Sequence, residues 1–285
     1  MKKIILCPNP IRDADLAYSK NLFQRLAARG LEPILSPHHY IPTDRTPLCV
    51  EPSLLDEQLR SADLLIGLGG DGTILHLARL AAPHQVPILT VNMGHKGFIA
   101  EMEPDDIEKI VDIALLDKPN IQERMMIDVH VLRNGQTVYE CFALNDVVVR
   151  GTTRQVILEV YDDKQRITRF SGDGIIVCTP TGSTAYSMSA GGPLIEPTAR
   201  NLAITPICAH ALIAKSFVLP SSNRAVTVKI TLGDEKDGYL AVDGSSFELE
   251  DQDEIQVTQS QYVTRLIKAS ERSFYEIVND KLGGI

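Results

Sequence analysis

The chain has 285 residues, of which 44% are hydrophobic, so it is long enough for two domains or for one large domain with a substantial core. Its formal net charge of −9 argues against general nucleic-acid binding, which depends on basic patches. No apolar run approaches the roughly 20 residues of a membrane-spanning helix, and the apolar part of the N-terminus is too short for a signal peptide. The five cysteines are scattered and lack a C-x-x-C pair, which favours reduced thiols in a cytoplasmic protein over disulfides or a zinc site.

Strand and helix patterns alternate in the first part of the chain. Apolar runs predict strands at 3–7, 32–35, 63–68 and 87–92, and helical spacing predicts helices at 15–29, 53–60, 73–81 and 104–116. Four prolines predict a loop over residues 37–52. The alternation predicts an α/β domain with a Rossmann-like parallel sheet.

The pattern changes near residue 120 to a series of short strands. They are expected at 124–132, 137–142, 146–150, 156–161, 166–170, 174–179, 225–232, 239–242 and 254–258, with Asn134-Gly135 as a hairpin turn. This predicts a mainly antiparallel β domain, followed by a helix at 270–280 that returns to the first domain. The expected boundaries are 1–122 for the α/β domain, 123–268 for the β-rich domain and 269–285 for the C-terminal segment.

A glycine cluster, Gly67 to Thr73, directly follows one of the predicted strands. Glycines allow a phosphate to approach the backbone, and the N-terminus of the next helix offers free N–H groups to an anion. A carboxylate there repels phosphate, so Asp71 is predicted to serve as a base, a metal partner or a hydroxyl acceptor. The cluster also satisfies G-x-G-x-x-G, but the acidic residue that a dinucleotide fold places about 20 residues later is missing. A tight strand–helix turn without a ligand is the alternative interpretation.

Two further segments combine polar groups suited to a nucleoside. Residues 171–193 contain many hydroxyls and glycines together with Asp173, and the alternative is a packing turn of small residues. Asn145-Asp146 provides an amide and a carboxylate for a ribose diol or an adenine edge, although such a pair is more often a turn signal. His76 falls one turn into the helix after the glycine cluster, where it either faces a phosphate or lies on the surface.

Three motifs together resemble bacterial NAD kinases: Gly69-Gly70-Asp71-Gly72-Thr73, Asn145-Asp146, and the run T-P-T-G-S-T-A-Y-S at 179–187. The first motif is shared with lipid kinases, sphingoid kinases and phosphofructokinases, whereas the third is much more specific. The resemblance extends from about Lys3 to Ile267. It implies transfer of the γ-phosphoryl group of ATP to the 2′-hydroxyl of the adenosine ribose of NAD, which yields NADP.

The resemblance also implies roles for individual residues. Asp71 is the implied general base, and the implied phosphate loop for ATP comprises Gly69, Gly70, Gly72 and Thr73. The implied NAD-binding residues are Asp71, Gly72, His76, Asn145, Asp146, Arg154, Asp173, Thr184, Ala185, Tyr186, Ser187, Met188 and Ser189. A divalent ion, Mg or Mn, is expected to be held mainly by ATP, with no dedicated protein metal site. A homodimer or homotetramer is expected, with no nucleic-acid or membrane partner.

The chain departs from the family pattern at several positions. The second motif is usually Asn-Glu, Lys96 stands where leucine is usual, and Ser245 replaces a frequent glutamine. These changes bear on substrate affinity and on the choice between NAD and NADH more than on the reaction. The alternatives are a lipid or sphingoid kinase with the same glycine loop, and a dinucleotide sensor without catalysis.

Overall fold

The computed structural model describes residues 1–36, 55–94, 97–210, 215–233 and 238–283, so the predicted loop at 37–52 lies outside the described residues. The chain divides into two compact units. Unit 1 comprises Met1–Glu123 together with Thr264–Ile285, and unit 2 comprises Arg124–Val263. Within the described residues, no helix is both long enough and apolar enough to cross a membrane.

Unit 1 is built on a parallel sheet. Its strands β1 (Lys3–Pro8), β2 (Glu32–Leu35), β3 (Leu64–Gly69) and β4 (Ile88–Asn92) are arranged in the order β2-β1-β3-β4. The end of β16 (Glu254–Ile267) extends this sheet, because Leu266 pairs with Ile88 in the parallel sense. Strands β3 and β4 are buried along their whole length, which explains their continuous apolar runs.

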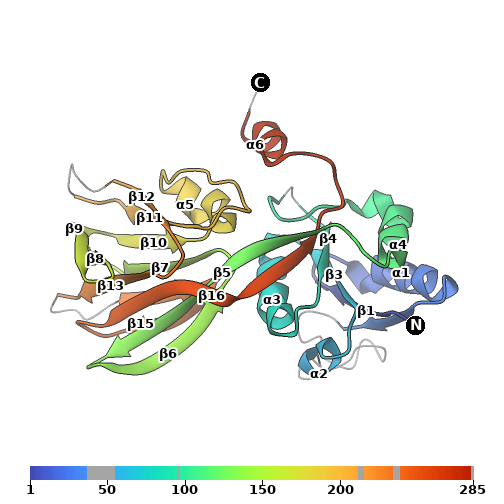
Figure 1. Ribbon diagram of the computed structural model, residues 1–285, viewed down its shortest axis with the longest axis horizontal. Helices are drawn as coiled ribbons and strands as arrows, with labels where there is room; N and C mark the ends of the chain where they lie inside the picture. The colour runs from blue at the N-terminus through green and yellow to red at the C-terminus, as the bar shows by residue number, and fades with distance from the viewer. Residues whose placement is uncertain (37–54, 95–96, 211–214, 234–237, 284–285) are drawn as a thin grey trace. The chain divides into compact units, whose positions relative to one another are not determined.

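Helices pack on both faces of the unit 1 strands (Figure 1). They are α1 (Ala17–Ala28), α2 (Leu55–Leu59), α3 (Asp71–Ala81) and α4 (Ile107–Leu115), with short 3-10 turns at Ala14–Leu16, Ala82–His84 and Pro104–Asp106. Helix α1 contacts α4, and α2 contacts α3. The C-terminal helix α6 (Phe274–Leu282) begins with a capping box, in which Ser273 and Glu276 bond each other's backbone N–H groups.

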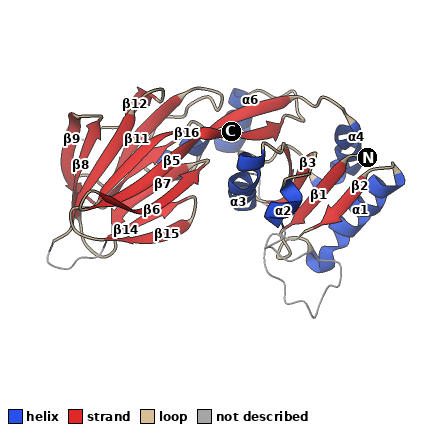
Figure 2. Cartoon of the chain, turned by 60° about the horizontal axis from the view of Figure 1, so that its bottom comes forward, coloured by secondary structure: helices blue, strands red, loops and turns tan. Residues whose placement is uncertain are grey.

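Unit 2 consists almost entirely of strands (Figure 2). One sheet has the order β12-β11-β10-β7-β14-β15; in the other, β16, β13, β8 and β9 follow one another and β5 and β6 join at β16. The strand bounds are β5 Ile121–Arg133, β6 Gln136–Ala143, β7 Asp146–Gly151, β8 Val156–Asp162, β9 Gln165–Gly172, β10 Gly174–Cys178, β11 Asn201–Ile207, β12 Phe217–Pro220, β13 Ala225–Thr231, β14 Gly238–Val242 and β15 Ser245–Leu249. A 3-10 turn (Thr181–Thr184) and the short helix α5 (Tyr186–Ser189) follow β10.

The core of unit 2 lies between these sheets. Alternate residues of β7, Val147 and Val149, join Leu158 of β8, Ile175 of β10 and Val228 of β13 in one buried cluster. The period-2 alternation of the strands therefore places one face of each sheet against the other.

The predicted fold class is confirmed: a parallel α/β domain, an antiparallel β domain and a C-terminal helix. Strands β11, β12 and β15 were not predicted. Strand β11 contains Pro206, β12 has only four residues, and β15 begins with two serines. The sequence did contain a turn signal for β15, the pair Asp243-Gly244. In the structure both residues adopt positive φ (43° and 85°) in the turn before this strand. Asp-Gly is a favoured sequence for such a hairpin turn.

The packing of β8 generates a prediction with a neighbouring control. Leu158 is fully buried, whereas Ile157, the preceding residue on the same strand, is 36% exposed. We expect Leu158→Ala to lower the free energy of unfolding by about 2–5 kcal/mol, because it leaves a cavity in the core. Ile157→Ala should cost less than about 1 kcal/mol. Urea unfolding measures both, and equal losses would contradict this orientation of the strand.

Candidate functional site

The glycine loop lies where β3 ends and α3 begins, and its glycines serve two purposes. A Cβ on Gly69 would lie 2.4 Å from Thr73 Oγ1, and one on Gly67 would lie 2.7 Å from Leu77 Cδ1, so a side chain at either position would force Thr73 or Leu77 to move. A Cβ on Gly70 or Gly72 would meet nothing within 4 Å. The backbone of these two residues therefore borders open space at the N-terminus of an 11-residue helix.

The Asp71 carboxylate is held by the backbone of another loop of unit 1. The Phe98 N–H donates to its Oδ2 at 2.8 Å, and the Ile99 N–H donates to its Oδ1 at 3.2 Å. A Cβ on Gly97 would lie 2.0 Å from Oδ1, so only glycine fits there. Each carboxylate oxygen retains a further acceptor site, so the oriented group can still accept a proton or a hydrogen bond.

Residues 97–99 were not predicted to hold Asp71. In the sequence, this loop was marked only by Lys96, which departs from the family pattern. The contact between Phe98 and Asp71 spans 27 residues, and no local pattern reports it. His95 and Lys96 of that loop lie outside the described residues.

Thr73 of the predicted phosphate loop and His76, a predicted NAD-binding residue, differ in accessibility. Thr73 is buried, and its hydroxyl accepts a hydrogen bond from Asn9 Nδ2 at 3.1 Å. His76 is exposed on α3. The Thr73 side chain therefore forms an internal contact of unit 1, whereas the His76 side chain lies at the surface.

In unit 2, Asn145 and Asp146 stand at the beginning of β7, and Asp146 pairs with Cys178 at the end of β10. The N–H groups of Leu144, Asn145 and Asp146 donate to the Asp243 carboxylate at 2.7, 3.0 and 3.1 Å. Sequence reasoning did not predict this contact, which spans 97 to 99 residues.

Two buried oxygens at this place have no hydrogen-bond partner among the residues that the structure describes: Asn145 Oδ1 and Thr181 Oγ1. Their residues lie side by side, because a Cβ on Gly182 would meet the Asn145 carbonyl oxygen at 2.2 Å. Buried polar atoms almost always have partners in folded proteins. A group outside the chain, either a buried water or a ligand that donates hydrogen bonds, would satisfy this pair.

The hydroxyl-rich segment after β10 is divided between interior and surface. Thr184 donates to the Thr181 carbonyl at 3.1 Å, and Ser187 exchanges a hydrogen bond with Thr205 at 2.9 Å. Ser187 is fully buried, whereas Tyr186 is 39% exposed. Ser189 is exposed, and Ala185 and Met188 are partly exposed. Surface side chains of this segment are thus available to a ligand, whereas the Ser187 hydroxyl is used internally.

Arg154 and Asp173 lie at the other end of the same strands. Asp173 directly precedes β10, whose last residue pairs with Asp146, and Arg154 follows the end of β7. Five residues of strand separate the two ends, which is about 16 Å at roughly 3.3 Å per residue. Within unit 2 the structure therefore does not bring Arg154 and Asp173 together with Asp146.

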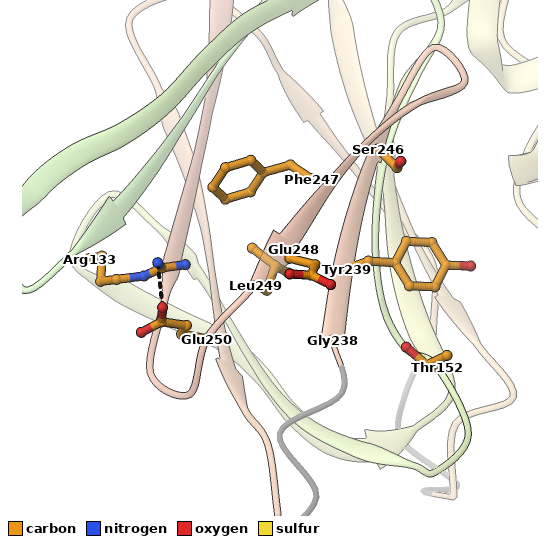
Figure 3. A pocket seen from close by; sticks show the side chains of 9 residues that line it. All are labelled: Arg133, Thr152, Gly238, Tyr239, Ser246, Phe247, Glu248, Leu249 and Glu250. Atoms are coloured by element: carbon orange, nitrogen blue, oxygen red, sulfur yellow. Dashed lines mark hydrogen bonds and ion pairs between the residues drawn. The ribbon is translucent and has the colours of Figure 1, made fainter.

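The described cavities do not coincide with these residues. A cavity of about 710 Å³ is lined mainly by residues of the β14–β15 hairpin. The side chains of Tyr239 and Phe247 point to opposite sides there, and Arg133 pairs with Glu250 (Figure 3). No predicted site residue lines it. A cavity of about 140 Å³ in unit 1 is lined by Gly97, next to Phe98, and by Lys281, whose ammonium lies 4.6 Å from the centre of the Phe98 ring.

Within the described ranges, no group of three or more His, Cys, Asp or Glu side chains is arranged to hold a metal ion. Asp71 is a single carboxylate that already accepts two N–H groups. This donor set fits an ion that takes most of its oxygen ligands from a nucleotide, which is how Mg²⁺ is commonly bound.

In unit 2, the Asp146 carboxyl has an unusual pKa. Burial raises the pKa of this carboxyl to about 7, and the adjacent Asp243 carboxylate adds to the rise. Burial also raises the pKa of the neighbouring Cys178 thiol to about 12, so this thiol is neutral. Asp146 can therefore change its charge close to neutral pH.

Comparisons with known proteins agree with this description. The ATP-NAD kinase N-terminal domain family matches residues 37–117, and the ATP-NAD kinase C-terminal domain family matches residues 144–269. An NAD kinase of Caldanaerobacter subterraneus is 36% identical over 99% of both chains. An NAD kinase of Natranaerobius thermophilus is 42% identical over 78% of both chains. The chain therefore belongs to the ATP-NAD kinase family.

Solved structures share the fold. A yeast NADH kinase complexed with NADH has a TM-score of 0.86 at 24% identity, covering 100% of this chain and 88% of that one. An NAD kinase from Archaeoglobus fulgidus in complex with ATP has a TM-score of 0.73 at 22% identity, covering 97% and 98%.

The environment of Asp146 predicts a titration near neutral pH. We expect its side-chain carboxyl carbon, followed by NMR in the ligand-free protein, to titrate with a midpoint near pH 7, because burial disfavours the charged form. Loss of the signal in Asp146→Asn assigns it. A midpoint near the ordinary value of about 4 would contradict the prediction.

Proposed function

We propose that this protein transfers the γ-phosphoryl group of ATP to the 2′-hydroxyl of the adenosine ribose of NAD, with NADP and ADP as products. One observation carries the proposal: two backbone N–H groups orient the Asp71 carboxylate beside the open backbone of Gly70 and Gly72. Membership of the ATP-NAD kinase family supports NAD as acceptor and ATP as donor.

In the proposed mechanism Asp71 is the general base. The 2′-oxygen forms a bond to the γ-phosphorus, the bond from this phosphorus to the β–γ bridging oxygen breaks, and the hydroxyl proton passes to the carboxylate. The N–H groups of Phe98 and Ile99 hold the carboxylate in one orientation, which reduces the entropy that is lost when the reacting groups align.

The glycine loop supplies the electrostatic part of the mechanism. Backbone N–H groups at Gly70 and Gly72, at the positive end of α3, stabilise phosphate charge without a side chain in the way. A divalent ion, proposed to be magnesium or manganese, neutralises the triphosphate when it is bound with ATP.

Unit 2 is proposed to recognise the nucleoside. The unpartnered Asn145 Oδ1 and Thr181 Oγ1 accept hydrogen bonds from the ligand, and Asp146 accepts one when it is ionised. Tyr186 and Ser189 contribute exposed side chains from α5. A homo-oligomer in the cytoplasm remains part of the proposal.

The test of the proposed function is NADP formation from NAD, ATP and magnesium, measured with an NADP-specific dehydrogenase. We expect Asp71→Asn to lower kcat by about 100- to 10,000-fold, because general base catalysis is lost. Asp63→Asn is the matched control: the Asp63 carboxylate also accepts a backbone N–H in unit 1, from Lys3 at 2.8 Å, and its variant should retain activity.

The same assay separates the alternatives. No NADP from the wild-type chain, together with phosphorylation of a sphingoid base or diacylglycerol, would favour the lipid kinase. NAD binding without turnover with any donor would favour the sensor.

The contact between Gly97 and Asp71 gives a second prediction. We expect Gly97→Ala to lower kcat by about 100-fold or more, because its Cβ would collide with Asp71 Oδ1 and displace the base. Gly94→Ala is the control, since a Cβ there would only approach the flexible Arg12 side chain, at 3.4 Å. Equal kcat values for two folded variants would be incompatible with a fixed carboxylate.

A further inference from the structure

We propose that Asp243 is the positioning residue for Asn145 and Asp146, and that it determines where these two side chains meet the nucleoside of NAD. The inference deepens the proposed function and rests on it. Asp243 itself is not proposed to touch the substrate: it acts through the backbone of residues 144–146.

The backbone of residues 144–146 is held by two residues distant in sequence. All three N–H groups donate to the Asp243 carboxylate, and the Asp243 N–H donates back to the Asp146 carbonyl at 3.2 Å. The Thr179 hydroxyl donates to the Leu144 carbonyl at 2.6 Å, and its N–H donates to the Asn145 carbonyl at 2.8 Å. Every backbone N–H and C=O of this segment therefore has a partner.

These hydrogen bonds fix the backbone that carries the Asn145 and Asp146 side chains. A carboxylate that accepts several N–H groups forms charge-assisted hydrogen bonds, which are about twice as strong as neutral ones. With the backbone restrained, the buried Asn145 Oδ1 remains without a partner in the described part of the chain. A mobile backbone would allow this oxygen to rotate toward an internal donor, so Asp243 preserves an acceptor for the ligand.

The turn at Asp243 allows its carboxylate to be removed without straining the backbone. Asp243 has φ of 43° and precedes Gly244 with φ of 85°. Asparagine and glycine both tolerate this left-handed region, whereas most other residues do not. Asp243→Asn keeps one acceptor oxygen for the N–H groups, and Asp243→Gly keeps none, so the pair forms a graded series.

The charge of Asp243 provides a readout that folding alone does not change. Among the described residues, the titratable groups that interact with Asp146 are Asp243, from the β14–β15 turn, and Cys178, from β10. The Cys178 thiol is neutral near pH 7, so Asp243 supplies the nearby charge. Its removal should lower the pKa of Asp146 toward the ordinary value, because repulsion between like charges disappears.

The experiment measures the Kd for NAD by calorimetry, KM for NAD and for ATP, and the NMR titration of Asp146. We expect Asp243→Gly to raise Kd and KM for NAD by about 10- to 100-fold, since charge-assisted hydrogen bonds are lost. Asp243→Asn should have a smaller effect, KM for ATP should change less than about threefold in both, and the Asp146 midpoint should fall.

Asp251→Asn is the matched control, because the Asp251 carboxylate accepts the Leu232 N–H at 2.8 Å elsewhere in unit 2. It should leave all these values unchanged. An unchanged Kd for NAD in folded Asp243→Gly would overturn the positioning role. So would a variant with a lower melting temperature and a lower kcat but with an unchanged KM for NAD and an unchanged titration of Asp146. If the wild-type chain neither binds nor phosphorylates NAD, the proposed function fails as well, so the two failures are distinguishable.

Discussion

In each unit, the candidate site residues are organised by a carboxylate that accepts backbone N–H groups from a distant segment. In unit 1, Asp71 accepts two such groups from the loop after β4, and in unit 2, Asp243 accepts three from the segment before β7. Each interaction satisfies N–H groups that no strand or helix partner satisfies, and each places a loop at a defined position. In unit 1 the accepting carboxylate is itself the proposed base, whereas in unit 2 it supports the residues that are proposed to bind the substrate.

Close approach of the backbone explains several of the glycines. Gly97 is needed because the Asp71 carboxylate occupies the position of a Cβ, and Gly182 is needed because the Asn145 carbonyl does so. Gly70 and Gly72 differ, since nothing of the protein lies where their Cβ atoms would be. The first two glycines allow segments that are distant in sequence to approach each other, and the last two border the open space in which a phosphate is proposed to bind.

The structure shows the surroundings of Asp146, one of the departures from the family pattern. The resemblance places a glutamate where this chain has Asp146, and the shorter side chain lies partly buried near Asp243, with a pKa near 7. Affinity for the nucleoside is therefore proposed to depend on pH in the neutral range, and Asp243 contributes to that dependence.

Much of the architecture was predictable from local patterns. Apolar runs such as Leu64–Gly69 and the change near residue 120 from alternating strands and helices to strands alone report the fold class. Burial on both faces of a strand gives a continuous apolar run, and burial on one face gives a period of two. Short strands such as β15 carry too few residues for a period to be visible, and only the Asp243-Gly244 turn indicated it.

By itself the sequence determined the class of fold, the family, and Asp71 as the proposed base, because these depend on residue type and local spacing. The tertiary structure decided which groups hold Asp71 and Asn145, that the Ser187 hydroxyl is internal, and that Asp173 lies a strand length away from Asp146. These properties arise from contacts between residues that are tens of positions apart. Such contacts leave no periodic signal in the sequence, because the local residues do not specify which distant segment will become the partner.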